Sequence, residues 1–266
     1  MGFLSGLFNT LRNRFQYRVR LKAARSVSPL DNFEYNRHYW DLYARTWNKR
    51  TARVENPEIG EKERESYIRY LGDHWGRLED LETIVEDYFV PFITSESVVA
   101  EIGVGGGRIA ARLAGRVGEL YCFDIAPAML DRAREALSAH RNARFVLLEG
   151  PDFPDEYRGR FDFLYAFDVL VHFDLHMLWR YLQTFQSLLK PQGKAFIHTA
   201  NLAAPGGWEY FSGQQAYQVE SHYFVSPETV RILSRKAGFS IVKESEVDPG
   251  NFYLNRDYLA VLQKNS

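Results

Sequence analysis

The 266-residue sequence contains a single cysteine, Cys122, which stands in an apolar stretch. One thiol cannot build a disulfide framework or a cysteine-based zinc site, so we expect Cys122 to be a buried, inert side chain. No stretch is apolar enough to span a membrane. Arg12 and Arg14 also interrupt the apolar core that a secretory signal peptide would need. These absences predict a cytoplasmic protein.

The first thirty residues contain no Asp or Glu, although the whole chain has a formal net charge of −1. The near-neutral total gives no electrostatic indication of a nucleic-acid partner. Segment 1–25 carries an apolar helical stripe with basic flanks, which is typical of helices that lie on an anionic membrane surface. A helix packed on its own domain, or a frayed terminus, explains the same pattern. Peripheral contact with the inner face of a membrane is therefore one hypothesis for residues 1–25.

Aromatic residues make up 15% of the chain, and five of them fall between Tyr35 and Trp47 among charged residues. A second helical stripe of apolar residues runs from Leu78 to Phe92. We expect residues 1–93 to form an amphipathic segment and a helical cap. Residues 94–266 would then form a second domain.

From Ser97 onward, short apolar runs alternate with helical patterns. The expected strands are 97–102, 119–123, 145–148, 161–167, 193–199, 239–247 and 252–263, and the expected helices include 175–189 and 226–237. This alternation predicts an α/β fold in which helices cover both faces of a mostly parallel sheet. Segment 201–224 is rich in rings and glycines, so we expect a lid-like insertion there. A surface excursion packed by its own aromatic residues is the alternative.

A glycine-rich motif, Glu101 to Gly107, lies between the first expected strand and its helix. Its glycines let the backbone turn sharply and approach a ligand closely. A nicotinamide dehydrogenase could use such a turn, but its fingerprint needs a third glycine where Arg108 stands. The carboxylate of Glu101 would repel a pyrophosphate and attract an ammonium group such as that of methionine.

Asp124 stands at the end of the next strand, about twenty residues beyond the glycines. A carboxylate at this place can accept hydrogen bonds from ribose hydroxyls. The alternative is that Asp124 caps the helix that begins near Pro127.

Segments 101–107 and 124–130 together resemble the first two motifs of the class I S-adenosylmethionine-dependent methyltransferases. Further segments that resemble this family are 145–152, 161–172 and 189–194. Lys194 departs from the pattern, because many members have a second glycine there. The resemblance covers about residues 95–263. It implies a seven-stranded, mostly parallel Rossmann-like sheet whose last strand is antiparallel, and S-adenosyl-L-methionine as the cofactor.

The resemblance also implies which residues bind the cofactor. They are Glu101, Gly103, Gly105, Gly107, Asp124, Met129, Glu149, Gly150 and Phe167. The residues of the glycine motif would hold the methionine end, Asp124 the ribose and Met129 the adenine ring. Residues 149 and 150 would meet the adenine edge, where a backbone contact from Gly150 is an alternative to the side chain. Phe167 would lie near the sulfonium. For Arg108, an ion pair with the cofactor's carboxylate and a surface salt bridge are both open.

A hydroxyl acceptor benefits from a base that takes its proton. His172 follows the fourth strand, at the sheet edge where open α/β folds bind ligands, and its side chain titrates near physiological pH. We therefore predict His172 as the catalytic base and Asp168 as a second catalytic candidate, with His198 and His222 as weaker ones. A histidine that only orders its loop is the alternative, and a reaction driven by alignment needs no base. No compact cluster of His and carboxylate residues indicates a metal site.

These features predict an enzyme that moves a methyl group from S-adenosylmethionine to a hydroxyl of a small molecule or glycan, including a lipid-linked one. An N-methyltransferase or a lipid-headgroup methyltransferase is the first alternative. A non-enzymatic scaffold and a nicotinamide oxidoreductase are remote ones. Nucleic-acid methylation is disfavoured, because the Asn/Asp-Pro-Pro-Tyr/Phe signature of amino-group methylases is absent after the fourth strand.

Overall fold

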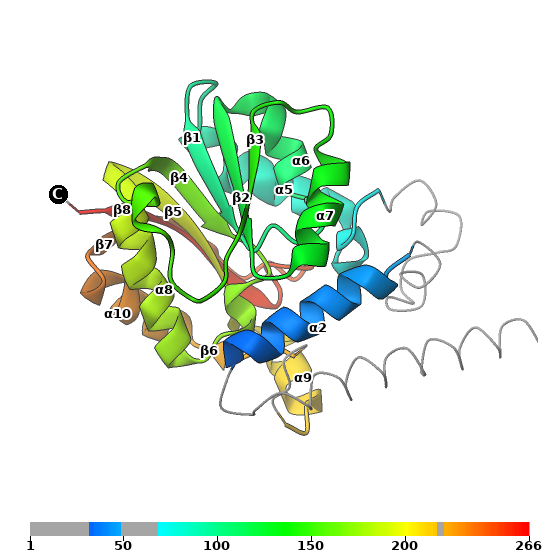
Figure 1. Cartoon of the computed structure of the whole chain (residues 1–266). Coiled ribbons are helices and arrows are strands. Elements are labelled where there is room, and N and C mark those ends of the chain that lie inside the picture. Colours follow the sequence, from blue (N-terminus) through cyan, green and yellow to red (C-terminus); the bar gives the residue numbers. More distant parts are fainter. Residues whose placement is uncertain (1–31, 49–68, 217–220, 266) are drawn as a thin grey trace, which may run out of the picture.

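The computed structural model describes residues 32–48, 69–216 and 221–265 (Figure 1). The predicted membrane-contact segment 1–25 lies outside these ranges. The helices and 3-10 turns are α2 (Asn32–Thr46), η1 (Asp73–Trp75), α5 (Leu78–Tyr88), η2 (Val90–Phe92), α6 (Ala110–Leu113), η3 (Ala114–Arg116), α7 (Pro127–Ala136), η4 (Asp155–Tyr157), η5 (Leu170–His172), α8 (Leu175–Leu188), α9 (Pro205–Gly213) and α10 (Pro227–Lys236). The strands are β1 (Val98–Ile102), β2 (Glu119–Asp124), β3 (Ala143–Leu147), β4 (Phe161–Ala166), β5 (Leu189–Asn201), β6 (Phe224–Val225), β7 (Phe239–Glu244) and β8 (Asp257–Lys264).

The strands form one sheet in the order β3-β2-β1-β4-β5-β8-β7. The strands from β3 to β5 in this order are parallel, and β8 runs antiparallel to both β5 and β7. The predicted α/β fold with an antiparallel last strand is confirmed. An eighth strand, β6, pairs with β5 off this path. No sequence period predicts β6, because it has only two residues.

The order of the strands reverses between β1 and β4. β2 and β3 follow β1 on one side, and the chain then crosses back to place β4 on the other side of β1. Ligands of open α/β sheets bind at the carboxyl ends of the strands that flank such a reversal. The fold therefore directs attention to the loops after β1 and β4.

In most strands, alternate residues serve two hydrophobic clusters, one on each face of the sheet. In β4, Phe163 and Tyr165 belong to the first cluster, and Leu164 and Ala166 belong to the second. The first cluster includes the buried sides of α5, α6 and α7, and the second includes those of α8 and α10. Strands buried from both sides explain why the sequence shows nearly continuous apolar runs there.

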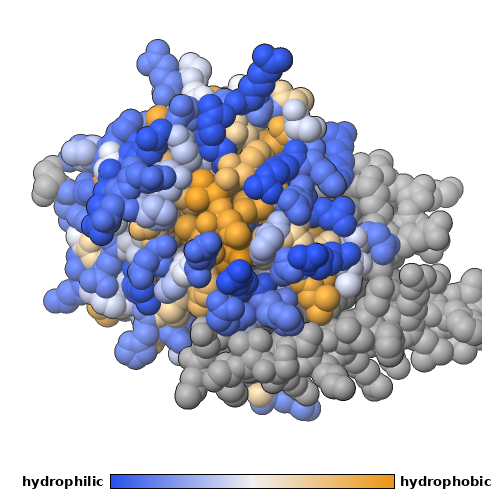
Figure 2. Space-filling model, viewed as in Figure 1, coloured by the Kyte–Doolittle hydropathy of each residue, from blue (hydrophilic) through white to orange (hydrophobic). Residues whose placement is uncertain are grey.

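The helix α2 docks on the start of α7. Tyr39 and Tyr43 of α2 pack in one cluster with Met129 of α7. Asp41 accepts a hydrogen bond on Oδ1 from the N–H of Ala128, at 2.8 Å. Beside α2, apolar side chains gather in the middle of this face of the molecule and hydrophilic ones surround them (Figure 2). The helix thus lies at the border of an apolar part of the surface.

The helix α5 has a different place from α2, although both fall within the segment expected to form a cap. Leu81, Ile84 and Val85 of α5 are buried in the first cluster of the sheet. They share this cluster with Val99 of β1 and Phe163 of β4. The residues on both sides of the domain boundary that we expected at residue 93 therefore pack together. Of the two helices, only α2 lies at the carboxyl ends of the parallel strands.

Local sequence signals fix the starts of two helices. Asp174 caps α8 by accepting hydrogen bonds from the N–H groups of His176 (2.8 Å) and Met177 (2.9 Å). Ser226 caps α10 by accepting a hydrogen bond from the N–H of Thr229 at 3.2 Å. Of the helices in the described ranges, none has the length and apolar character needed to cross a membrane.

Candidate active site

A pocket with about 830 Å³ of empty space, part of it open to solvent, lies at the carboxyl ends of β1, β2 and β4. It brings together the predicted residues Glu101, Gly103, Gly105, Asp124, Met129, Phe167, Asp168 and His172. The other three, Gly107, Glu149 and Gly150, do not line it. Glu149 is exposed in the turn after β3. The adenine contacts of residues 149 and 150 therefore stay predictions.

The glycine motif turns at two positions that need glycine. Gly103 has a φ of 71°, and a Cβ there would lie 2.4 Å from Cγ2 of Val169. Gly105 has a φ of 53°, and a Cβ there would meet nothing within 4 Å. The positive φ and the open space at Gly105 suit a ligand that passes close to the backbone. At Gly107, whose φ is 81°, a Cβ would lie 3.2 Å from Cα of Ala133 in α7, so this glycine serves helix packing.

Asp124 ties this turn to the end of β2. Its Oδ2 accepts a hydrogen bond from the N–H of Gly105, and its Oδ1 accepts one from the N–H of Ala126, both at 2.9 Å. Burial raises the pKa of Asp124 to about 6, against the opposing effect of these backbone donors. The capping residue of α7 is Ala126, so Asp124 is not its N-cap. Each carboxylate oxygen keeps a second lone pair that could accept a hydroxyl.

Glu101 is 2% exposed at the end of β1. The hydroxyl of Tyr165 donates a hydrogen bond to its Oε2 at 2.8 Å. Burial raises the pKa of Glu101 to about 8, and the Tyr165 hydrogen bond and the charge of Arg108 offset only part of that rise. A cationic ligand would stabilise the ionised form of such a buried carboxyl group, because its opposite charge compensates for the solvation that burial removes.

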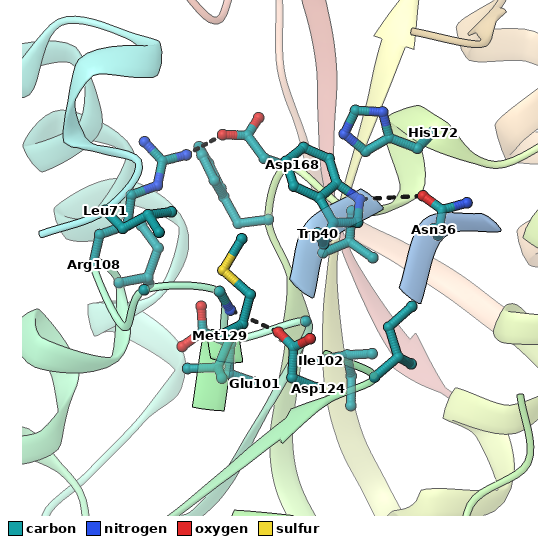
Figure 3. A pocket seen from close by; sticks show the side chains of 18 of the residues that line it. Asn36, Trp40, Leu71, Glu101, Ile102, Arg108, Asp124, Met129, Asp168 and His172 are labelled. Carbon is teal, nitrogen blue, oxygen red and sulfur yellow. Dashed lines mark hydrogen bonds and ion pairs between the residues drawn. The ribbon is translucent and has the colours of Figure 1, made fainter. Parts of the chain in front are cut away.

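Arg108 is 5% exposed, so the surface salt bridge that we considered is wrong. Its guanidinium pairs with the carboxylate of Asp168 and donates hydrogen bonds to the carbonyl O of Gly72 (3.0 Å) and the hydroxyl of Tyr253 (3.1 Å). The same group lies 5.3 Å from the ring centre of Phe167. Arg108 and Asp168 form one side of the pocket, and Trp40, Asn36 and His172 lie on another (Figure 3).

His172 is buried in η5, in the wall of the pocket. Its Nδ1 lies 2.9 Å from the carbonyl O of Ser221. Its ring lies 5.3 Å from that of Trp40 and 5.6 Å from that of His222. Burial lowers the pKa of His172. His198 and His222, the weaker base candidates, do not line the pocket.

Side chains from the N-terminal part line the pocket without being predicted as site residues. They are Asn36, Trp40, Leu71 and Trp75. The Nε1–H of Trp40 donates a hydrogen bond to Oδ1 of Asn36 at 3.2 Å, which fixes both groups on one side of α2 (Figure 3). The only sequence signal for them was the aromatic cluster before residue 48. None of the described residues of the expected lid, 201–224, lines the pocket.

The polar groups and the open space of the pocket fit S-adenosylmethionine. Glu101 offers a carboxylate for an ammonium group, Asp124 offers acceptors for ribose hydroxyls, and Gly105 leaves open space beside the backbone. Among the described residues, no group of three or more His, Cys, Asp or Glu side chains is arranged to hold a metal ion. Fold and site together are those expected of a nucleoside-binding α/β protein.

Comparison with known proteins identifies a methyltransferase domain. Residues 99–193 match the family model of a methyltransferase domain. A search of curated protein sequences gives no match to the chain. The structure is similar to magnesium protoporphyrin IX methyltransferase from Synechocystis PCC 6803 with bound S-adenosylhomocysteine, with 15% identity, a TM-score of 0.62, and coverage of 88% of this chain and 100% of that one. It is also similar to an S-adenosylmethionine-dependent methyltransferase from Methanosarcina mazei, with 14% identity, a TM-score of 0.54, and coverage of 67% and 97%.

Residues 99–193 form a methyltransferase domain, the chain has the Rossmann-like fold of class I S-adenosylmethionine-dependent methyltransferases, and S-adenosylmethionine is its cofactor. The predicted methyltransferase domain, fold and cofactor are thereby confirmed. A methyl acceptor completes the reaction.

Proposed function

We propose that the protein methylates a hydroxyl group of a small molecule or glycan, including a lipid-linked one, with His172 as the base. The observation that carries this proposal is the state of His172 in the pocket wall. The carbonyl O of Ser221 can only accept a hydrogen bond, so the nearby Nδ1 of His172 carries the proton. The acceptor lone pair of the neutral ring is then on Nε2.

The electrostatic environment of His172 favours a neutral imidazole ring, which is the form that can accept a proton. Burial lowers the pKa of His172, so its ring is neutral at physiological pH. The charge of Asp168 acts in the opposite direction and favours the imidazolium that forms when the ring takes a proton. Because the carboxylate of Asp168 is paired with Arg108, we propose an electrostatic role for it rather than proton transfer.

S-adenosylmethionine, when bound, supplies a methyl group that its sulfonium already activates. The residues of the chain would hold and orient the reactants and exclude water. Glu101 would hold the ammonium group, and Asp124 would accept hydrogen bonds from the ribose hydroxyls. Trp40 on α2 would restrict the access of water. His172 would take the proton of the acceptor hydroxyl at Nε2.

A second candidate is methylation of an amine, including the amine of a lipid headgroup. The rings of Trp40 and Trp75 line the same pocket, and aromatic faces attract cationic amines. An amine acceptor does not need His172 as a base. A variant without His172 therefore separates the two candidates.

The test combines an acceptor screen with a histidine variant. The full-length protein is incubated with S-adenosylmethionine and panels of hydroxyl compounds, glycans, lipid-linked sugars and amines, and formation of S-adenosylhomocysteine is measured. We expect turnover with a hydroxyl acceptor. The His172→Ala variant should lower kcat about 100-fold while the Kd for S-adenosylhomocysteine stays within about threefold. His176→Ala, an exposed histidine outside the pocket, is the control. Turnover confined to amines, or full activity of His172→Ala, would contradict the proposal.

A further inference from the structure

Asp168 has a strained backbone. It stands two residues after the end of β4 with a φ of 55°, in the left-handed region. Among the described residues, Gln192 is the only other non-glycine residue with a positive φ. Strained positions persist only where neighbouring groups impose them, and they cluster at ligand sites. Because Asp168 lines the pocket, the group that holds its backbone matters for the site.

That group is His198, a fully buried side chain on β5. The backbone N–H of Asp168 donates a hydrogen bond to Nδ1 of His198 at 3.1 Å. Nδ1 also lies 3.3 Å from Oδ1 of Asp168, so this nitrogen contacts both the backbone and the carboxylate of that residue. In the tautomer whose Nδ1 accepts from the N–H, Nε2 carries the proton. Nε2 lies 3.0 Å from Oδ2 of Asp257 on β8, and Asp257 is paired with Arg256. Asp257 therefore lies beside the nitrogen that carries the proton in this tautomer.

The peptide that His198 holds joins two residues of the pocket wall. The ring of Phe167 packs 4.7 Å from the ring of His198, and the carboxylate of Asp168 pairs with Arg108. A rotation of this peptide would displace the Phe167 ring and the Asp168 carboxylate together. Both line the pocket that holds the cofactor.

We propose that His198 is a positioning residue, which fixes the peptide of Asp168 through Nδ1 and thereby sets the cofactor-facing wall formed by Phe167 and Asp168. The proposal rests on the assignment of this pocket to S-adenosylmethionine, and it is independent of the acceptor. His198 itself touches neither reactant, since it lies behind the wall and not in it.

Two amide substitutions separate the two contacts of His198. In His198→Asn, the short side chain places an oxygen near the position of Nδ1, where it can accept from the Asp168 N–H. In His198→Gln, the longer side chain places an NH2 group near the position of Nε2, where it can donate to Asp257 but cannot serve Asp168. His198→Ala removes both contacts. All three are made in the full-length protein, and the Kd for S-adenosylhomocysteine is measured by calorimetry beside a thermal melt.

We expect His198→Gln and His198→Ala to weaken binding of S-adenosylhomocysteine about tenfold or more, and His198→Asn to stay within about threefold of the original protein. If His198 served only to fill space and pair with Asp257, the Gln variant would bind better than the Asn variant, which would overturn the proposal. Unchanged binding in all three variants would also overturn it. Failure of all three to fold would do the same, because it would show that His198 serves stability first. Absence of binding by the original protein would instead contradict the cofactor site itself.

Discussion

The hydroxyl of Tyr165 donates a 2.8 Å hydrogen bond to Oε2 of Glu101, and both side chains are buried between β1 and β4. This single donor does not replace the water that burial removes, so the pKa of Glu101 rises to about 8. Near neutral pH the raised pKa favours the protonated carboxyl group, and a bound ammonium group would favour the ionised form. A site built in this way couples the binding of an ammonium group to the release of a proton.

The coupling predicts how cofactor affinity depends on pH. An ammonium group favours the ionised form of Glu101, so binding lowers its pKa from about 8 and releases a proton below that pH. Asp124, with a pKa of about 6, adds to the effect at the acidic end, because its ionised form is the better acceptor. The affinity for S-adenosylhomocysteine should rise with pH between about 6 and 7.5, by at most about tenfold per pH unit for each proton released. Calorimetry in buffers of different ionisation enthalpy counts the protons.

The Glu101→Gln variant is the control for that measurement. Its amide cannot ionise, so proton release near neutral pH should disappear and the remaining pH dependence should move to the range of Asp124. Proton release that is unchanged in Glu101→Gln would show that another group is responsible.

Gly105 and Gly159 provide a matched pair for the ligand-facing turn. Both have positive φ values, 53° and 61°, and at neither would a Cβ meet an atom within 4 Å. Replacing either with alanine should cost about 1 kcal/mol of stability through backbone strain. Only Gly105 lines the pocket, so only Gly105→Ala should weaken binding of S-adenosylhomocysteine, by about tenfold or more. Equal affinities of the two variants would refute a close approach of the ligand at Gly105.

Trp40 and Trp47 test the role of α2. Both pack in the cluster that joins α2 to α7, but only Trp40 lines the pocket. Trp40→Ala should speed the dissociation of S-adenosylhomocysteine about three- to tenfold, because it opens the cover of the site. Trp47→Ala should lower the melting temperature without changing that rate. Stopped-flow displacement gives the dissociation rates, and equal rates in both variants would contradict the role of α2 as a cover.

The sequence was most informative where function depends on neighbouring residues in the chain. The glycine motif and Glu101 lie within seven consecutive residues, and Asp124 follows after one strand, so spacing alone predicts that they converge. The alternation of apolar runs and helical patterns likewise predicted the mostly parallel α/β sheet, but not the order of its strands. All of these residues except Gly107 do line one pocket.

The contacts between distant segments could not be predicted in this way. Arg108 is 60 residues from Asp168 and 145 from Tyr253, and nothing in the local pattern pairs them. The place of Trp40 at the pocket depends on how α2 packs on α7. An amphipathic pattern predicts that a helix packs on its domain, but it does not predict the orientation of that helix. The sequence offered His198 only as a weaker base candidate, and its contacts with Asp168 and Asp257 arise when β4, β5 and β8 are brought together.

The central claim is that Glu101 binds the amino-acid end of the cofactor and Asp124 binds its ribose. Adenosine has the ribose but lacks the amino-acid end, so it separates the two roles. Titration of Glu101→Gln and Asp124→Asn with S-adenosylhomocysteine and with adenosine is the most direct test. Glu101→Gln should lose about 10- to 100-fold in affinity for S-adenosylhomocysteine and about twofold or less for adenosine, whereas Asp124→Asn should lose affinity for both. Undiminished binding of S-adenosylhomocysteine by both variants, or an equal loss for both ligands in Glu101→Gln, would contradict the account.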